Sequence, residues 1–329
     1  MDRKVAALVI AFLIATAGLY YFEQAKKREL KVLTVSTTTS LYDTGFLDEV
    51  AKIFKEKYGI ELHFVAKGTG AAINDAKLGV SSAILVHAKS KEEEFLREGY
   101  GVNRKIFAYN FFVIVGPKDD PAGIKGLKVV EAMKKIAEAG RAGKAIWVSR
   151  GDMSGTNVKE IALWKAAGFD YEEVRKEPWF RETGAGMGQT LLYTSNERAY
   201  TLSDTGTYLK FKKAGKIDLE VLVDRGEELI NVYSIIIVNP EKGNENFDLA
   251  MRLEKWLITE GQEVLKNFGK EEFGKPLFYP AVEVLEKKIE PYYSWIVKYG
   301  FIDGSECPEE YRYMAEKYGV EFHGVGSGS

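Results

Sequence analysis

The sequence predicts an α/β fold divided into two lobes. From Leu30 onward, short apolar runs alternate with amphipathic segments of helical period, which is typical of α/β proteins. Two long β-prone segments, "FAYNFFVIVGP" and "NVYSIIIVNP", bracket residues 117–230, which contain strands and helices of their own. Two lobes joined by paired strands suit a hinge that closes on a ligand. A single mixed sheet is the alternative interpretation.

The first lobe is predicted from regular alternation of strands and helices. The segment "FLDEVAKIFKEKYG" places apolar side chains on one helical stripe and stops at Gly59, a typical helix end. The charged segment "SKEEEFLREG" predicts a helix that begins at a capping serine, Ser90. The other elements expected here are the strands "LKVLTVS", "ELHFVA" and "SAILVH" and the short helix "AAINDAKLG".

The bracketing segments set the expected domain boundaries. The first lobe combines residues 30–112 with residues 233–280, and the second lobe spans residues 113–232. Strands of the second lobe are expected in "AIWVSR", "AYTLSD" and "LEVLVD". Residues 281–329 form a C-terminal extension without an assigned function, in which "PEEYRYMAEKYG" predicts a short helix ended by Gly319.

Residues 1–29 predict an export signal or a membrane anchor. The basic start "MDRK" precedes an apolar run from Val5 to Phe22, and the small residues of "ATAG" suit a cleavage site. The run is almost long enough to cross a bilayer uncleaved, which takes roughly 20 residues. A buried helix is the structural alternative. We therefore expect an exported protein, at the cell surface, periplasmic, or tethered to the membrane by this helix.

The composition excludes several classes of function. The 46 basic and 48 acidic residues nearly balance, so the chain lacks the basic surplus typical of nucleic-acid binding. One cysteine, Cys307, cannot form an intramolecular disulfide or a thiolate metal cluster. With only three histidines in 329 residues, histidine-rich metal chemistry is not expected either.

The segment "SRGDMSGTN", residues 149–157, predicts an anion-binding loop. Arg150 is always charged and can hold an oxyanion with two parallel hydrogen bonds. Ser154 and Thr156 offer hydroxyl groups, and Gly155 allows a close approach of the backbone to a ligand. The loop opens the helical segment "NVKEIALWKAAG", so these groups lie at the positive end of a helix.

Two further loops share this design, in which a strand feeds a polar turn that opens a helix. They are "STTTS" at residues 36–40 and "KGTG" at residues 67–70, and a glycine-rich turn, "TGAGMGQT", can add donors. Simple helix capping is the alternative for each loop alone. Three helix ends with Arg150 supply enough positive charge for a dianion, so no metal and no cofactor are expected.

Catalytic motifs do not match. The chain has no G-x-x-x-x-G-K-[ST] phosphate loop, no G-x-S-x-G nucleophile elbow and no H-E-x-x-H motif. His87 and Asp75 offer a base and an orienting carboxylate, but no nucleophile is identified for them. We therefore expect a binding protein and not an enzyme, with phosphoryl transfer as the last alternative.

The sequence resembles the tungstate-binding proteins of ABC importers, within the wider group of tetrahedral-oxyanion receptors. The similar segments run in family order from about residue 31 to residue 280. They are "TTTSLYDTGFLD", "KGTG", "EGYGVNRKIFAYNFFVIVGPKDDPAGI", "SRGDMSGTNVKEIALW", "GAGMGQTL", "AYTLSDTGTYL" and "NVYSIIIVNP". The resemblance implies a two-lobed, hinged fold of the type II periplasmic-binding-protein kind, with tungstate in the cleft and an ABC permease membrane subunit as partner. Molybdate is a possible second ligand.

The same resemblance assigns candidate ligand-binding residues. It implicates Thr38, Thr39 and Ser40 in the first loop, and it implicates Arg150, Ser154, Gly155 and Thr156 in the second lobe. Thr69 is added because it holds an analogous position at a helix start. The arginine and Ser-Gly-Thr pattern is also similar to the anion loop of phosphate-binding proteins, so that pattern alone does not select the anion.

Two features depart from the family pattern. Ala88 stands where the family has an acidic residue after the third strand, and the chain continues beyond Pro280. The loops offer mainly donors, which favours tungstate, molybdate or sulfate over phosphate, provided that Asp43 and Asp152 hold loop groups in place. A phosphate or sulfate receptor on the same fold and a membrane-tethered oxyanion sensor remain the alternatives.

Overall fold

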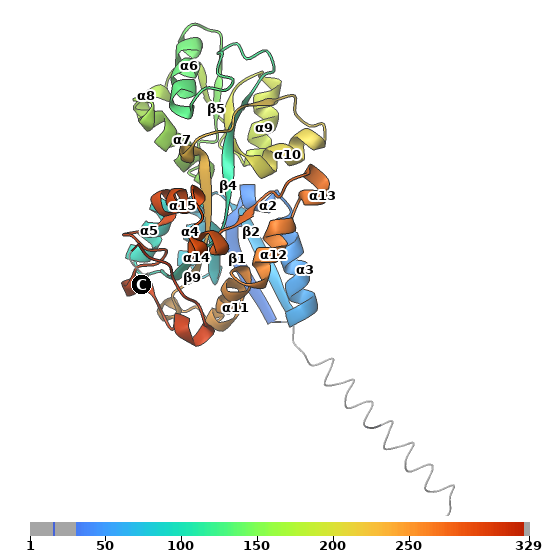
Figure 1. The fold of residues 1–329 in the computed structure, drawn as a ribbon, viewed down its shortest axis with the longest axis vertical. Coiled ribbons are helices and arrows are strands. Elements are labelled where there is room, and N and C mark those ends of the chain that lie inside the picture. The colour runs from blue at the N-terminus through green and yellow to red at the C-terminus, as the bar shows by residue number, and fades with distance from the viewer. Residues whose placement is uncertain (1–15, 17–30, 326–329) are drawn as a thin grey trace, which may run out of the picture.

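The structure is a computed structural model that describes residue 16 and residues 31–325. The rest of the expected signal or anchor, residues 1–29, lies outside the described residues. Within the described part of the chain, no helix is both long enough and apolar enough to cross a membrane. The chain forms two halves along the long axis of the molecule, and two long strands run from one half into the other (Figure 1).

The first half is built on a mixed sheet, and its parallel strands come from the N-terminal part of the chain. These strands are β1 (Lys31–Thr38), β2 (Ile60–Lys67), β3 (Ala83–Val86), β4 (Gly101–Gly116), β9 (Ile230–Val238) and β10 (Tyr279–Pro280). Their order is β10-β4-β9-β3-β1-β2, with β1 parallel to both β2 and β3. Strand β9 is antiparallel to β3 and to β4 and lies between them, so a late strand occupies the middle of the sheet.

Strand β4 belongs to both halves. Its residues from Gly101 to Phe111 pair with β9, and its residues from Phe112 to Gly116 pair with strands of the second half. The sixteen-residue strand is rich in aromatic and β-branched side chains, which favour an extended backbone. The two halves are therefore joined by hydrogen-bonded strands, as the sequence predicted for "FAYNFFVIVGP" and "NVYSIIIVNP".

Helices cover both faces of the first-half sheet. They are α2 (Thr39–Tyr42), α3 (Phe46–Tyr58), α4 (Thr69–Lys77), α5 (Lys89–Arg97), α11 (Phe247–Leu257), α12 (Glu260–Asn267) and α13 (Lys270–Phe273). One cluster joins α3 to α11 through Phe54 and Trp256, whose rings meet edge to face at 5.4 Å. A second cluster on the other face contains Ile73 of α4 and Phe95 of α5.

The second half has its own core. Its strands are β5 (Trp147–Ser149), β6 (Phe180–Glu182), β7 (Thr201–Asp204) and β8 (Glu220–Val223). Its helices are α6 (Val129–Arg141), α7 (Gly155–Ala166), α8 (Tyr171–Val174), α9 (Met187–Asn196) and α10 (Thr205–Lys213), with the short turn η1 (Glu227–Leu229) before β9. Trp147 and Trp164 meet edge to face at 5.4 Å in the centre of this core and fix α7 against β5.

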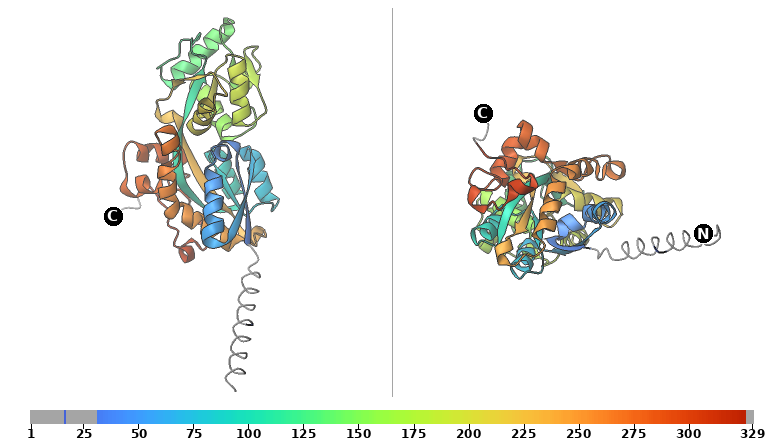
Figure 2. Two further views of the ribbon diagram at one scale, coloured as in Figure 1. Left: turned by 90° about the vertical axis from the view of Figure 1, so that its right-hand side faces the viewer. Right: turned by 90° about the horizontal axis from the view of Figure 1, so that it is seen from below.

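The C-terminal extension packs onto the first half, on the side of β4 and β9 (Figure 2). It contains α14 (Val282–Lys287), α15 (Tyr292–Gly300) and the short turns η3 (Glu309–Tyr311) and η4 (Ala315–Tyr318); η2 (Pro240–Lys242) precedes α11. Glu306 is fully buried and forms a 2.5 Å ion pair with Lys105 of β4. The extension is thus part of the first-half core.

Two local predictions are wrong. Ser90 does not cap α5; the helix begins at Lys89, and the Glu92 carboxylate accepts the Ala88 backbone N–H at 2.7 Å. "PEEYRYMAEKYG" is not one helix, because Tyr313 exchanges two hydrogen bonds with the Asn103 side chain and Met314 takes a left-handed φ of 49°. Gly319 does end the second of the two turns that replace it.

Candidate functional site

The first anion loop lies where β1 passes into α2. Thr38 and Ser40 are fully buried, and the Thr38 hydroxyl accepts the Leu41 backbone N–H at 3.3 Å as a helix cap. The Thr38 and Ser40 hydroxyls lie 3.2 Å apart. Thr39 is half-buried and points toward the second half, where its hydroxyl accepts from the Arg150 guanidinium.

The second anion loop joins β5 to α7. The Asp152 carboxylate holds this loop, because its Oδ1 accepts the Ser154 N–H at 3.1 Å and its Oδ2 accepts Arg150 Nη2 at 2.6 Å. Ser154 then caps α7 by accepting the Asn157 N–H at 3.2 Å. Asp152 therefore meets the condition set from the sequence, since it holds a loop amide and Arg150 in place, and Ser154 uses its oxygen within the loop.

The structure brings the predicted loops together. Arg150 Nη2 donates to Thr39 Oγ1 at 3.0 Å, which joins the first and second loops across the two halves. The third loop also meets the second, since a Cβ built on Gly68 would lie only 3.0 Å from the Asp152 carbonyl oxygen. A Cβ built on Gly186, in the glycine-rich turn, would lie 3.3 Å from Thr39 Oγ1.

Several buried polar atoms in these loops have no hydrogen-bond partner within the described chain. They are Nε and Nη1 of Arg150, the hydroxyl oxygens of Thr69 and Thr156, and the hydroxyl oxygen of Ser36 at the β1 end of the first loop. All four side chains are at most 1% exposed. A buried polar group without a partner costs about 1–3 kcal/mol, so such groups are rare unless a ligand or water satisfies them. Guanidinium and hydroxyl groups can all donate to an oxyanion.

His87 lies directly behind the first loop. Its Nε2 is 3.0 Å from Ser40 Oγ, and its Nδ1 is 2.8 Å from Asn231 Oδ1 on β9. Burial, and after it the charge of Arg150, lowers the pKa of His87 to about 3, so the ring is neutral. Asp75 is not its partner, because that carboxylate pairs with Lys67 at 2.7 Å. The suggested base and orienter are therefore not assembled.

Two carboxylates lie in the electrostatic field of Arg150. Burial raises the pKa of Asp204 to about 6, and it also raises the pKa of Asp43, for which the charges of Arg150 and Lys210 act in the opposite direction. Asp204 Oδ1 caps α10 by accepting the Thr207 N–H at 2.8 Å. Its Oδ2 is buried without a partner in the described chain and is an acceptor when ionised.

Glu160 supports the second loop from within α7 and was not singled out from the sequence. Its carboxylate accepts from Ser149 Oγ at 2.7 Å and from Trp147 Nε1 at 2.8 Å. Burial raises its pKa to about 7, while hydrogen bonds from Ser149, Trp147, Asn157 and Trp164 act in the opposite direction. The Glu160 carboxylate thereby connects Trp147 and Trp164 of the second core to Ser149, the last residue of β5 before the loop at Arg150.

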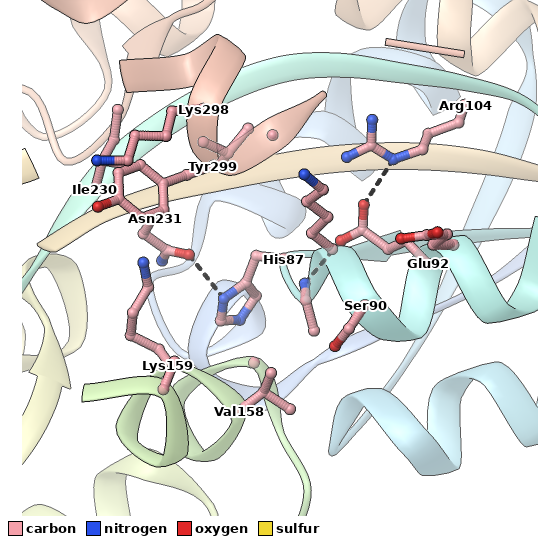
Figure 3. A pocket seen from close by; sticks show the side chains of 17 residues that line it. His87, Ser90, Glu92, Arg104, Val158, Lys159, Ile230, Asn231, Lys298 and Tyr299 are labelled. Carbon is pink, nitrogen blue, oxygen red and sulfur yellow. Dashed lines mark hydrogen bonds and ion pairs between the residues drawn. The ribbon is translucent and has the colours of Figure 1, made fainter. Parts of the chain in front are cut away.

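A cavity of about 280 Å³ lies beside these loops, on the other side of His87. Figure 3 shows His87 between Asn231 and the part of α7 that carries Val158 and Lys159. Lys159 extends toward Tyr299 of α15, with its ammonium 4.7 Å from the ring centroid. The cavity therefore adjoins both halves and the C-terminal extension.

Comparisons with known proteins agree with this arrangement. The family model described as a PBP superfamily domain matches residues 23–260. The tungstate-binding protein TupA of Peptoclostridium acidaminophilum is 40% identical over 253 residues, which cover 75% of this chain and 85% of that protein. The chain belongs to the tungstate-binding protein family of the PBP superfamily.

Solved structures of the family show the same fold. The structure described as the tungstate ABC transporter from Geobacter sulfurreducens has a TM-score of 0.64 and 43% identity, covering 72% of this chain and 98% of that one. The tungstate-binding protein TupA from Desulfovibrio alaskensis G20 has a TM-score of 0.63 and 39% identity, covering 76% and 98%. The fold predicted from the sequence, an α/β protein of the two-lobed binding-protein kind, is thus confirmed.

Proposed function

We propose that the protein is the substrate-binding protein of an ABC importer and that it captures tungstate between its two halves. Family membership supports the transport role. The observation that carries the choice of site is the set of buried donors without partners around Arg150, contributed by Thr69 of the first half and by Thr156 and Arg150 of the second.

The chemistry of this set suits a tetrahedral oxyanion that carries no proton. Each of these groups can donate a hydrogen bond, and charge-assisted bonds from a guanidinium are the strongest of them. Helices α4 and α7 add the partial positive charge of their N-terminal ends. Tungstate and molybdate are dianions of this kind, and we infer that both fit the site.

The residues divide into donors and supports. We propose that Arg150, Thr69 and Thr156 donate from their side chains and that the backbone at Thr39 and Gly155 lines the anion. Thr38, Ser40 and Ser154 hold the loops through hydrogen bonds of their own. Because the site binds and releases an intact anion, the protein acts without catalysis.

The halves and the termini complete this proposal. We propose that residues 30–112 with 233–280 and residues 113–232 are the two lobes, which move as a hinge about β4 and β9, and that residues 281–329 extend the first lobe. Residues 1–29 would direct export or tether the protein to the membrane. The closed form would then deliver its anion to the membrane subunit of the permease.

Titration with four oxyanions tests the proposal. Trp147 and Trp164 both donate to Glu160 behind the second loop, so tryptophan fluorescence should report ligand binding there. We expect saturable binding of tungstate and molybdate at pH 7.5, confirmed by calorimetry, and much weaker binding of sulfate and phosphate. Stronger binding of phosphate than of tungstate would contradict the assignment.

One observation favours phosphate as the second candidate. Asp204 Oδ2 is a buried acceptor without a partner in the described chain, and an ionised carboxylate can accept the proton of monohydrogen phosphate. If phosphate were the ligand, Asp204→Asn would weaken its binding sharply. If tungstate is the ligand, the same substitution should leave tungstate affinity unchanged or improve it, because a negative charge is removed.

A further inference from the structure

His87 forms a contact between the two halves at the site. It follows β3 in the first half, and its ring lies against the first residue of α7 in the second half. A Cβ built on Gly155 would be 2.5 Å from both Cε1 and Nδ1 of this ring. From the sequence, the absence of a side chain at Gly155 was explained by the close approach of a ligand. The structure adds a second reason, because the His87 ring occupies the space that a side chain would need.

The hydrogen-bond pattern around Asn231 determines the tautomer of His87. The Asn231 amide nitrogen donates to Asn110 Oδ1 at 3.0 Å and to Tyr233 OH at 2.8 Å. The amide oxygen is therefore the atom that faces His87 Nδ1, at 2.8 Å. An amide oxygen can only accept, so Nδ1 of His87 carries the hydrogen.

The tautomer in turn determines what Ser40 can do. With Nδ1 protonated in a neutral ring, Nε2 is an acceptor, and the hydroxyl 3.0 Å away must donate to it. A serine hydroxyl has one hydrogen, so Ser40 has none left for an anion. Its oxygen can still accept from the Thr38 hydroxyl at 3.2 Å, which ties the two ends of the loop together.

The same chain of hydrogen bonds reaches the strands that join the halves. Asn231 and Tyr233 lie on β9, and Asn110 lies on β4 at the end of its pairing with β9. The first anion loop is therefore connected through His87 to both strands on which the halves would move.

We propose, resting on the tungstate-binding function above, that His87 is a positioning residue for anion capture. It accepts the Ser40 hydroxyl, holds the first loop in its donor geometry, and presents a fixed surface against which the Gly155 end of α7 closes. Ser40 accordingly supplies no side-chain donor to the anion, and its effect on affinity passes through His87.

Nuclear magnetic resonance tests the tautomer without any ligand. The chain has three histidines, and His63 on the surface and the partly buried His323 provide internal references for the buried ring. In a long-range proton–nitrogen spectrum of the ¹⁵N-histidine-labelled full chain, His87 should carry hydrogen on Nδ1 alone between pH 5 and pH 8. Hydrogen on Nε2, or titration within that range, would overturn the proposal.

Double substitution tests the connection to binding. The variants must keep the ring volume, because the 280 Å³ cavity adjoins His87 and truncation to alanine would open the site to it (Figure 3). His87→Gln retains an acceptor for Ser40, whereas His87→Leu does not. We expect His87→Leu and Ser40→Ala each to weaken tungstate binding about tenfold, the equivalent of one hydrogen bond.

The decisive result is the double variant. If Ser40 acts through His87, then Ser40→Ala should add nothing to His87→Leu, while His87→Gln should retain most of the wild-type affinity. If the loss of tungstate affinity in the double variant equals the product of the losses in the two single variants, the proposal is overturned. Failure of the wild-type protein to bind tungstate would reject the proposed function instead, and the tautomer measurement would still decide the role of His87 in the loop.

Discussion

Arg150 Nη2 donates to Thr39 Oγ1 at 3.0 Å, and this bond connects a loop of the second half to a loop of the first. The same nitrogen donates to Asp152 at 2.6 Å, which leaves Nε and Nη1 buried and unpartnered in the described part of the chain. Nη2 of the guanidinium thus joins the halves. Its other two nitrogens, Nε and Nη1, are the strongest candidates to donate hydrogen bonds to the anion.

Replacement of Arg150 by alanine should weaken tungstate binding by more than about 2 kcal/mol, because a buried charge-assisted contact is lost. Calorimetry on the purified variant measures this change directly. Arg141→Ala is the matched control, since Arg141 is exposed and pairs with Glu177 far from the loops. An unchanged affinity in Arg150→Ala would remove this residue from the site.

Thr69→Val should separate binding from stability. The hydroxyl of Thr69 is buried without a partner in the described chain, so its removal should leave the ligand-free protein as stable or more stable. Tungstate affinity should nevertheless fall about tenfold, because a donor is lost. Thr201→Val should instead lower the stability and leave tungstate affinity unchanged, because the Thr201 hydroxyl donates to the Val148 carbonyl at 2.7 Å. Thermal melting with and without tungstate distinguishes the two variants.

Gly155→Ala should impair closure of the halves. The new methyl group would lie 2.5 Å from the His87 ring, which is fixed by its own hydrogen bonds. We expect a loss of tungstate affinity of about 5- to 150-fold, which corresponds to the overpacking cost of about 1–3 kcal/mol. Gly70→Ala is the control, because its methyl group would meet Met153 Cβ at 4.0 Å, and it should bind normally.

The pH dependence of stability should contain a contribution from Glu160. Its folded pKa is raised to about 7 from the usual 4.5, so the folded state holds a proton that the unfolded state releases between these values. The free energy of unfolding should therefore fall as the pH rises from 4.5 to 7. Urea unfolding of Glu160→Gln should show a shallower fall; an identical slope would contradict the assignment.

Glu306→Ala should destabilise the protein without changing the site. The buried carboxylate accepts from Lys105 Nζ at 2.5 Å and from the His323 backbone N–H at 2.8 Å. Its loss would leave the buried Lys105 ammonium without a counter-ion, although the bond to the Glu321 carbonyl at 2.7 Å would remain. Breaking a buried pair from one side costs roughly 3–5 kcal/mol. Urea unfolding measures this loss, and the tungstate affinity of the folded variant should be unchanged.

Features that depend on neighbouring residues could be predicted from the sequence. The helix from Phe46 to Tyr58 ends at Gly59 as its apolar stripe indicates, and α7 begins directly after the loop that contains Arg150, as predicted. Ser154 caps α7, which was the alternative to its predicted role as a ligand donor. The prediction failed at Ser90, because the Glu92 carboxylate satisfies the start of α5 instead. It failed again near Met314, because tertiary bonds from Asn103 hold that backbone out of a helix.

The supports of the site depend on residues that are distant in sequence. Asn231 lies 144 positions from His87, and Arg150 lies 111 positions from Thr39. Local patterns identify the loops, but they contain no information on which buried group will face another after folding. The same holds for Glu160, since its position within α7 gives no sign of the four hydrogen-bond donors that its carboxylate meets.

The order of the chain constrains the way the molecule assembles during synthesis. The second half is made from one continuous segment between β4 and β9, so most of its core is available before the rest of the chain has emerged. The first half needs β9, α11 and finally Glu306, which neutralises Lys105 on a strand made two hundred residues earlier. Its native packing therefore waits for the last part of the chain, and the half that begins first is completed last.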